Sequence, residues 1–236
     1  HRDLHYPLRR QRQMCIRDRN KIAAIVSNLS ETNKNGGCCM KDIEFWFSIG
    51  STYSYLSVAR LSALERDTGV TFSWHPFSVR KLMQEMDNIP FPPTKKAKSD
   101  YMWRDIERRA QKYGIPVSVP APYPLKEFDR ANRIAVLGMQ EGWCVDYVCA
   151  TYRRWFQEGL EAGSEPNLSD SLIEIGQDPK RVLQLAESDQ VTKSSLEQTD
   201  SAREKGIFGS PTCIVDGELF WGDDRVEDAL WWLKNR

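Results

Sequence analysis

The sequence predicts an α/β fold in which a small β-sheet is interrupted by a long helical insertion. Three observations predict it. From residue 42 the chain opens with a strand–helix–strand pattern, continues with about 130 residues of helical character, and closes with two short strands and a helix. The composition agrees with a globular protein, since 40% of the residues are apolar and 28% are charged.

The opening unit consists of two apolar runs around a helix. Residues 42–48 (DIEFWFS) and residues 70–77 (VTFSWHPF) are β-rich, and each is short enough to be a single strand. Between them, residues 52–68 are expected to be helical, with Gly69 as the stop. A β-α-β unit of this kind implies a right-handed crossover and a parallel pair of strands.

The middle of the chain is expected to be mostly helical. Residues 98–114 are amphipathic, whereas the proline-rich stretch 117–125 is expected to be a loop because proline removes backbone donors. Four further helices are expected over FDRANRIAVLGMQEG, WCVDYVCATYRRWFQEG, LSDSLIEIG and DPKRVLQLAES. The last of these begins with Asp178 as N-cap, and another helix covers roughly 190–204.

The chain then returns to β character. Residues 210–222 (SPTCIVDGELFWG) are expected to form two short strands around Asp216-Gly217, a pair that strongly favours a two-residue hairpin. The final stretch DDRVEDALWWLKN is predicted to be a helix, because acidic residues in its first turn suit the helix dipole. This order of elements is that of a thioredoxin-like fold with a large all-helical insertion, and not of a doubly wound sheet.

We expect the chain to divide into three parts. Residues 40–78 and 188–236 would form the thioredoxin-like domain, and residues 79–187 the inserted helical domain. Residues 1–39 form a basic arm that we expect to be disordered or not native.

The arm differs in charge from the rest of the chain. Eight basic residues against three acidic ones give it a formal charge of +5, and the balance of 33 basic and 33 acidic residues leaves −5 for the remainder. We expect translation to start at Met40, with the arm as an upstream read-through. A basic organelle-targeting segment is the alternative, which Asp3 and Asp18 weaken.

Charge and cysteine content disfavour several classes of function. The formal charge of zero gives no reason to expect nucleic acid or an anionic membrane as a partner, and no run approaches the roughly 18 apolar residues of a membrane span. The six cysteines form no Cys-x-x-Cys pair and no cluster with zinc spacing, so we expect no metal site. Cys144 and Cys149 are expected to be buried thiols, and free thiols favour a reducing, cytoplasmic location.

The stretch FSIGSTYSYLS places Ser51 and Ser54 at a strand-to-helix corner, with the spacing at which other proteins of this build carry Cys-x-x-Cys. Unpaired N–H groups and the helix dipole favour negative charge there. A serine cannot act as a redox centre, but its hydroxyl can donate a hydrogen bond to the sulfur of a cofactor. On position alone Ser51 is more simply an N-cap, worth about 1 kcal/mol. Ser54 is expected to be structural.

Two later motifs could complete a binding site. Ser210-Pro211 precedes a β-run, where proline is uncommon, and a cis bond there would turn the Ser210 backbone outward to pair with an extended peptide. The default for Pro211 alone is a trans residue that starts a strand, since only about 5–6% of such bonds are cis. Asp223 and Asp224 are normally helix caps. Alternatively, one of them holds the ammonium of an α-amino acid zwitterion beside exposed N–H groups.

Three polar side chains between the two motifs have simpler explanations. Lys98 belongs to a lysine-rich stretch that is more often a solvated face than a site, and Asn88 lies shortly before it. Tyr123 lies in the stiff sequence PAPYP, where packing is the default, although rigid loops also position groups that bind ligands.

Taken together, these motifs resemble the 2-hydroxychromene-2-carboxylate isomerase family, which is close to the kappa-class glutathione transferases and lies within the thioredoxin-like family of DsbA. The resemblance runs from about Ile43 to Leu233. Its most specific pieces are FSIGSTYSYL, YMWRDIERRAQKYGIPVSVPAPYP and GIFGSPTCIVDGELFWGDDR.

The resemblance implies a role for each candidate residue. Ser51 matches the catalytic serine that hydrogen-bonds the glutathione sulfur, and Ser210, before the cis Pro211, matches the residue whose backbone pairs with the cysteinyl unit. The γ-glutamyl end would be held by Trp221, Gly222, Asp223 and Asp224. Asn88 and Lys98 would line the glutathione and substrate cleft, and Tyr123 would contact the aromatic substrate. The family's usual Ser-Pro-Tyr is Ser51-Thr52-Tyr53 here.

The function implied by the resemblance is glutathione-dependent cis–trans isomerisation. It links 2-hydroxychromene-2-carboxylate and trans-o-hydroxybenzylidenepyruvate in aromatic catabolism, with glutathione as cofactor and a small aromatic pyruvate as substrate. A kappa-like glutathione transferase and a cysteine-free thioredoxin-like module that binds peptides remain alternatives. The tryptophan-rich LWWLKN near the C-terminus suits a homodimer interface.

Overall fold

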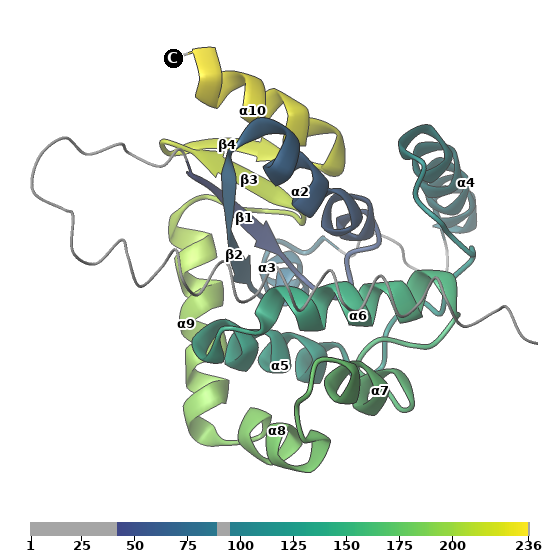
Figure 1. Ribbon diagram of the computed structural model, residues 1–236, viewed down its shortest axis with the longest axis vertical. Helices are drawn as coiled ribbons and strands as arrows, with labels where there is room; N and C mark the ends of the chain where they lie inside the picture. The colour runs from purple at the N-terminus through teal and green to yellow at the C-terminus, as the bar shows by residue number, and fades with distance from the viewer. Residues whose placement is uncertain (1–41, 89–94, 236) are drawn as a thin grey trace, which may run out of the picture. The chain divides into compact units, whose positions relative to one another are not determined.

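The computed structural model describes residues 42–88 and 95–235 (Figure 1). Its strands are β1 (Asp42–Phe47), β2 (Thr71–Pro76), β3 (Thr212–Val215) and β4 (Glu218–Trp221). Its α-helices are α2 (Ser54–Thr68), α3 (Val79–Glu85), α4 (Lys96–Tyr113), α5 (Phe128–Glu141), α6 (Cys144–Gln157), α7 (Asn167–Glu174), α8 (Pro179–Ala186), α9 (Asp189–Glu204) and α10 (Val226–Asn235), and η2 (Asp223–Arg225) is a 3-10 turn. The expectations for residues 1–39 and Met40 lie outside the described residues.

The four strands form one mixed sheet in the order β2-β1-β3-β4. β1 and β2 are parallel, as the β-α-β pattern predicts, and β3 is antiparallel to both of its neighbours. The turn between β3 and β4 contains Asp216 at φ 50° and Gly217 at φ 85°, both in the left-handed region that a two-residue hairpin requires. The predicted thioredoxin-like α/β fold with a helical insertion is confirmed.

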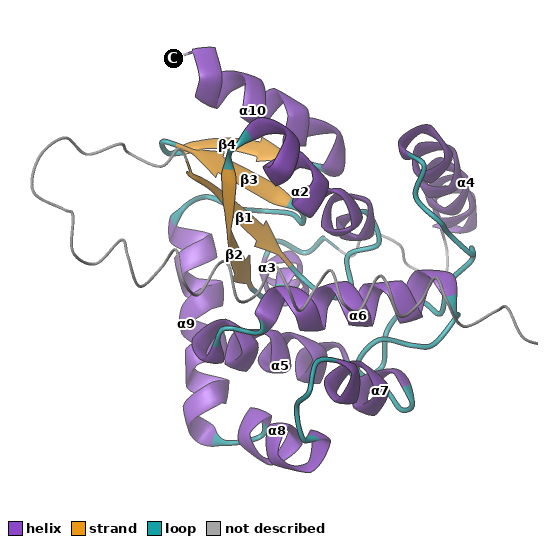
Figure 2. Ribbon diagram, viewed as in Figure 1, coloured by secondary structure: helices purple, strands orange, loops and turns teal. Residues whose placement is uncertain are grey.

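Helices cover the sheet and then extend beside it (Figure 2). α10 packs on β3 and β4, α2 contacts β2, and α5 and α9 also reach β2. Helices α5 to α8 pack on one another in a group beside the sheet. The division into domains at residues 78 and 188 stays a prediction. Among the described residues, no helix combines the length and apolar character needed to cross a membrane.

Helix ends follow the local signals in some places and depart from them in others. Asp178 is the N-cap of α8, as predicted, and its side chain accepts a hydrogen bond from Lys180 N at 3.1 Å. α2 starts at Ser54, two residues later than expected. The final helix is preceded by the separate turn η2.

Trp231, in the tryptophan-rich stretch for which a homodimer interface was predicted, is 61% exposed. Homodimerisation stays a prediction.

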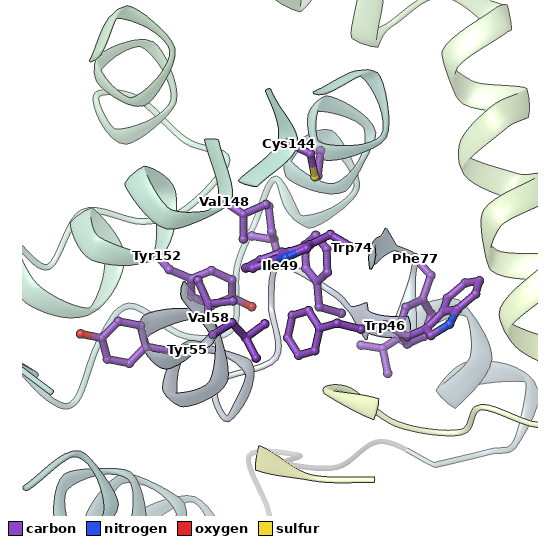
Figure 3. Packing of buried hydrophobic residues seen from close by; sticks show 14 of the residues in the cluster. Trp46, Ile49, Tyr55, Val58, Trp74, Phe77, Cys144, Val148 and Tyr152 are labelled. Carbon is purple, nitrogen blue, oxygen red and sulfur yellow. The ribbon is translucent and has the colours of Figure 1, made fainter. Parts of the chain in front are cut away.

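One apolar core joins the sheet to the inserted helices (Figure 3). Phe45 and Phe47 of β1 pack edge-on against Trp74, with ring centroids 5.0 and 5.5 Å apart. Between α2 and α6, the ring of Tyr55 stacks on the ring of Phe156, with centroids 4.4 Å apart. Burying such aromatic side chains contributes about 1.5–3 kcal/mol each. The helical insertion is therefore part of the same packed unit as α2.

The two thiols of α6 differ in burial, although both were predicted to be buried. Cys144 is buried, but Cys149 is only half-buried, because it faces the edge of the groove between α2 and α6. Burial nevertheless raises the pKa of Cys149 to about 12, so both thiols are protonated at neutral pH.

Candidate active site

Ser51 lies in the turn between β1 and α2. Its N–H donates to Ser48 O at 3.0 Å, and its hydroxyl donates to Ser210 O at 2.6 Å. The prediction that Ser51 caps α2 is wrong, since the N-cap is Tyr53 and no side chain caps this helix. A turn at residues 52–53 separates Ser51 from the helix, and the Ser51 hydroxyl faces the Ser210 loop instead of the first N–H groups of α2.

The loop opposite Ser51 carries the predicted cis bond. The Ser210-Pro211 peptide is cis, and the Ser210 carbonyl faces Ser51. The Ser210 hydroxyl accepts a hydrogen bond from Ser48 N at 2.9 Å and lies 2.9 Å from Ser54 Oγ. Ser54 is fully buried, and its structural role stays a prediction. Three hydrogen bonds therefore tie the β1–α2 corner to the proline loop.

Two buried side chains from the inserted helices hold this corner. The Tyr152 hydroxyl of α6 lies 3.0 Å from Ser48 O and 3.1 Å from Ser51 O. Asn132 of α5 donates to Ile49 O at 2.8 Å and accepts from Ile49 N at 2.9 Å. The backbone on both sides of Ser51 is thus fixed by α5 and α6.

Gly50 allows the corner to approach α5 closely. Its φ of +124° is rarely adopted by residues with a side chain, and a Cβ at this position would lie 2.4 Å from the Phe128 ring. The chain can therefore make this bend against Phe128 only with glycine immediately before Ser51.

Replacing Tyr152 by phenylalanine is expected to destabilise the fold by about 1–2 kcal/mol, because Ser51 O loses a buried donor. Urea denaturation of both proteins measures this difference. The matched control is Tyr147→Phe in the same helix, whose hydroxyl makes a longer 3.5 Å contact with Ala131 O and should cost less. Equal losses in the two variants would contradict a specific role for Tyr152 in holding the corner.

A cavity of about 260 Å³ adjoins the corner. Six of its lining residues were predicted from the sequence: Ser210, Pro211, Trp221, Gly222, Asp223 and Asp224. The other three were missed: Tyr53, Asp105 and Arg109. The proline loop, the end of β4 and the inner side of α4 therefore meet around one space.

An ion pair between Arg109 and Asp223 dominates the charge of this cavity. Asp223 is only 2% exposed, and its Oδ2 accepts from Arg109 Nε at 2.9 Å and lies 2.8 Å from Arg109 Nη2. Arg60 donates to the backbone oxygen of Asp223 at 2.8 Å. Burial raises the pKa of Asp223 to about 6, although Arg109 opposes this shift. The Asp223 carboxylate therefore already has the guanidinium of Arg109 as its ion-pair partner.

The other predicted residues of the cavity are more open. Trp221 is 53% exposed and packs edge-on against Phe208 at 4.9 Å. The Asp224 carboxylate is partly exposed and lies 3.6 Å from Arg225. Of the two predicted acids, Asp224 is thus the one whose carboxylate is more accessible to a ligand.

Residues missed from the sequence lie beside the buried face of α4. That face consists of Met102, Ile106 and Ala110, and Asp105 and Arg109 each precede one of its members. The amphipathic period could have placed both at the rim of the buried face. No local signal shows that the rim faces Asp223, which lies 114 residues away in the sequence.

Four of the predicted residues do not line this cavity: Ser51, which lies at the corner beside it, and Asn88, Lys98 and Tyr123. Asn88 is exposed just after α3, Lys98 is exposed in the first turns of α4, and Tyr123 is half-buried with its ring 6.0 Å from that of Trp103. Their roles stay predictions. A second cavity of about 500 Å³ lies between α2, the end of α4 and α6, and none of the predicted residues lines it.

Fold and corner together define the class of the protein. The family model described as a DSBA-like thioredoxin domain matches residues 42–230, which is most of the chain. The Cys-x-x-Cys positions of a redox member are occupied by Ser51 and Ser54 in this chain.

Similar proteins narrow the class further. The chain is 30% identical to the 2-hydroxychromene-2-carboxylate isomerase of Pseudomonas putida over 185 residues, which cover 78% of this chain and 90% of that protein. It is 23% identical to glutathione S-transferase kappa 2 of Caenorhabditis elegans, covering 79% and 88% of the two chains. The solved structure of a selenomethionine 2-hydroxychromene-2-carboxylate isomerase superposes with a TM-score of 0.72 at 29% identity, covering 82% of this chain and 96% of that one.

The chain therefore belongs to the 2-hydroxychromene-2-carboxylate isomerase family of DsbA-like thioredoxin proteins, and the protein is an enzyme.

Proposed function

We propose that the enzyme is a glutathione-dependent cis–trans isomerase that acts on 2-hydroxychromene-2-carboxylate and trans-o-hydroxybenzylidenepyruvate. The observation that carries the proposal is the Ser51 hydroxyl, held at the β1–α2 corner and directed at the loop before cis Pro211. The names of the similar isomerases support the reaction, and the similar kappa-class transferase supports glutathione.

The cavity beside the corner fits the γ-glutamyl end of glutathione. That end carries one ammonium and one carboxylate, and the lining offers both a guanidinium, from Arg109, and carboxylates, of which Asp224 is the more exposed. Trp221 presents an exposed ring at the rim. A mixed lining of this kind suits a zwitterion better than a simple anion or cation.

Ser51 has a single proton to donate, and in this structure Ser210 O accepts it. When glutathione is bound, we expect the hydroxyl to turn and donate to the sulfur, which frees Ser210 O to accept an N–H of the ligand backbone. One internal hydrogen bond is thus exchanged for two bonds to the ligand. The N-terminal end of α2, which follows Ser51, would favour negative charge on a sulfur held by that hydroxyl.

Glutathione supplies a thiolate that adds reversibly to the conjugated double bond and so allows it to rotate. The protein's part is to stabilise the thiolate through Ser51 and to orient the substrate beside it. Asn88, Lys98 and Tyr123 are the residues proposed from the resemblance to contact the substrate. The location of the protein in the cytoplasm is likewise a proposal.

Calorimetric titration with glutathione, followed by an absorbance assay with 2-hydroxychromene-2-carboxylate, tests the proposal. We expect binding at millimolar glutathione or below and conversion that depends on it. Absence of binding at millimolar glutathione would overturn the proposal.

A kappa-like transferase is the second candidate, favoured by the similarity to the Caenorhabditis elegans protein. The two activities differ in the fate of the thiol. Quantifying free glutathione after many turnovers separates them, because an isomerase returns it unchanged and a transferase consumes it stoichiometrically.

A further inference from the structure

Arg80 is a half-buried cation next to the corner. It is the second residue of α3, its guanidinium lies 4.3 Å from the centroid of the Phe128 ring, and one nitrogen donates to Leu125 O at 3.3 Å. Within residues 42–88 and 95–235, no carboxylate forms an ion pair with it. By contrast, Arg60, Arg109 and Arg154, also partly or wholly buried, each pair with an acid.

A single aromatic ring separates Arg80 from the residue before Ser51. The Phe128 ring that lies under the guanidinium is the ring that excludes a Cβ at Gly50. The Phe128 side chain is buried, and Asn132 donates to its backbone carbonyl oxygen at 2.9 Å. The guanidinium is therefore held at a defined place beside the catalytic corner.

Tyr123 belongs to the same neighbourhood. Burial raises the pKa of its phenol, and the positive charge of Arg80 opposes that rise, which means that the two side chains are close enough to interact. The Phe128 ring next to Gly50 thus has the Arg80 guanidinium over its face, and the Tyr123 phenol lies within electrostatic reach of that guanidinium. These are the groups needed to hold a flat aromatic molecule that carries a carboxylate.

We propose that Arg80 binds the carboxylate of the substrate and makes the enzyme selective for aryl-conjugated keto acids over neutral electrophiles. This inference rests on the proposed function. A guanidinium that is partly removed from water and lacks an acid gains a charge-assisted, two-pronged contact when such a ligand enters. Arg80 then fixes the distance between the carboxylate and the double bond, and so aligns that bond with the sulfur held by Ser51.

The test uses the full-length enzyme with trans-o-hydroxybenzylidenepyruvate and its methyl ester. Arg80→Gln removes the charge but keeps a donor for Leu125 O, and Arg80→Lys keeps the charge. For Arg80→Gln we expect KM for the acid to rise about 10- to 100-fold, because a charged hydrogen bond is lost, with a smaller change in kcat. Kinetics with the ester should stay within about twofold of the wild type, and Arg80→Lys should recover part of the loss.

Two controls keep the result specific. Arg133→Gln removes another half-buried arginine without an ion pair among the described residues, whose Nε donates to Ala186 O at 2.9 Å, and it should leave the preference for the acid unchanged. Calorimetric titration of glutathione into Arg80→Gln should give the wild-type affinity, which shows that the variant is folded and that its cofactor site is intact.

The outcomes separate this inference from the proposed function. A wild-type enzyme that is active, together with an Arg80→Gln variant that prefers the acid as strongly as the wild type, would overturn the role of Arg80 alone. A wild-type protein that neither binds glutathione nor converts the acid would overturn the proposed function. Should Arg80→Gln not fold, Arg80→Lys decides, because an unchanged KM and an unchanged preference in that variant would contradict two-pronged recognition by Arg80.

Discussion

Replacing Ser51 by alanine is expected to lower kcat/KM by about 100- to 1,000-fold, the usual effect of removing one donor that stabilises a reacting anion. The fold should survive, because the variant loses one hydrogen bond, to Ser210 O, worth about 1 kcal/mol. Glutathione affinity should fall far less than turnover, since the cavity proposed for the γ-glutamyl end is untouched.

The state of the bound thiol gives an independent measurement. The ultraviolet absorbance of the thiolate, followed against pH in the complex, should show a higher thiol pKa in Ser51→Ala than in the wild type. The matched control is Ser57→Ala in α2, six residues further along, because the buried Ser57 hydroxyl has no hydrogen-bond partner among the described residues. Turnover in Ser51→Ala that equals turnover in Ser57→Ala would rule the mechanism out.

Replacing Asp223 by asparagine is expected to stabilise the protein at neutral pH, because the buried carboxylate is then replaced by a neutral amide. The pKa of Asp223 is raised to about 6, so the folded state binds the carboxyl proton more tightly than the unfolded state does. The stability associated with this group is fully present below its unfolded pKa of about 4 and is lost as the pH rises through about 6. Arg109 and Arg60 reduce this loss and Asp224 adds to it, but burial outweighs them.

Urea denaturation of wild type and Asp223→Asn at several pH values measures the effect. The variant should be the more stable protein near pH 7, and the difference should nearly vanish near pH 4, where both side chains are neutral. Asp224→Asn, one residue further along and more exposed, should change stability by less than about 0.5 kcal/mol at either pH. A variant less stable than the wild type at pH 7 would show that the Arg109 ion pair outweighs the burial of the carboxylate.

The Asp223 carboxylate is expected to lower the stability of the folded state at neutral pH, and a role in ligand binding would explain why it is present. Asp223 lines the cavity proposed for the γ-glutamyl end and directs the Arg109 guanidinium toward it. We therefore expect Asp223→Asn to bind glutathione more weakly than the wild type, although it is the more stable protein. Destabilised charged groups of this kind are common at binding sites.

Local signals predicted much of the sheet and of the proline loop. The two β-rich runs of β1 and β2, and the Asp216-Gly217 turn, depend on neighbours in sequence, and both predictions were confirmed. The Ser-Pro pair alone was a weak signal for a cis bond at Pro211. The cis bond was expected only because the pair lies in a thioredoxin-like fold, and the bond is cis.

Long-range contacts explain what the sequence could not predict. Ser51 was expected to cap α2, but the Ser210 carbonyl, 159 residues away, attracts its hydroxyl instead. Arg109 gave no signal of its own, because its partner Asp223 lies in another part of the chain. Asn88 and Lys98 stay predictions, since neither lines the cavity beside the corner.

The way Asn132 and Tyr152 hold the Ser51 turn limits how this fold can be re-engineered. The sheet and the inserted helices are not independent parts of this protein. The turn that carries Ser51 is held by an amide on α5 and a phenol on α6. A chimera that keeps the sheet and imports the helices of a relative would therefore inherit a differently shaped turn, unless both anchoring side chains are transplanted back with it.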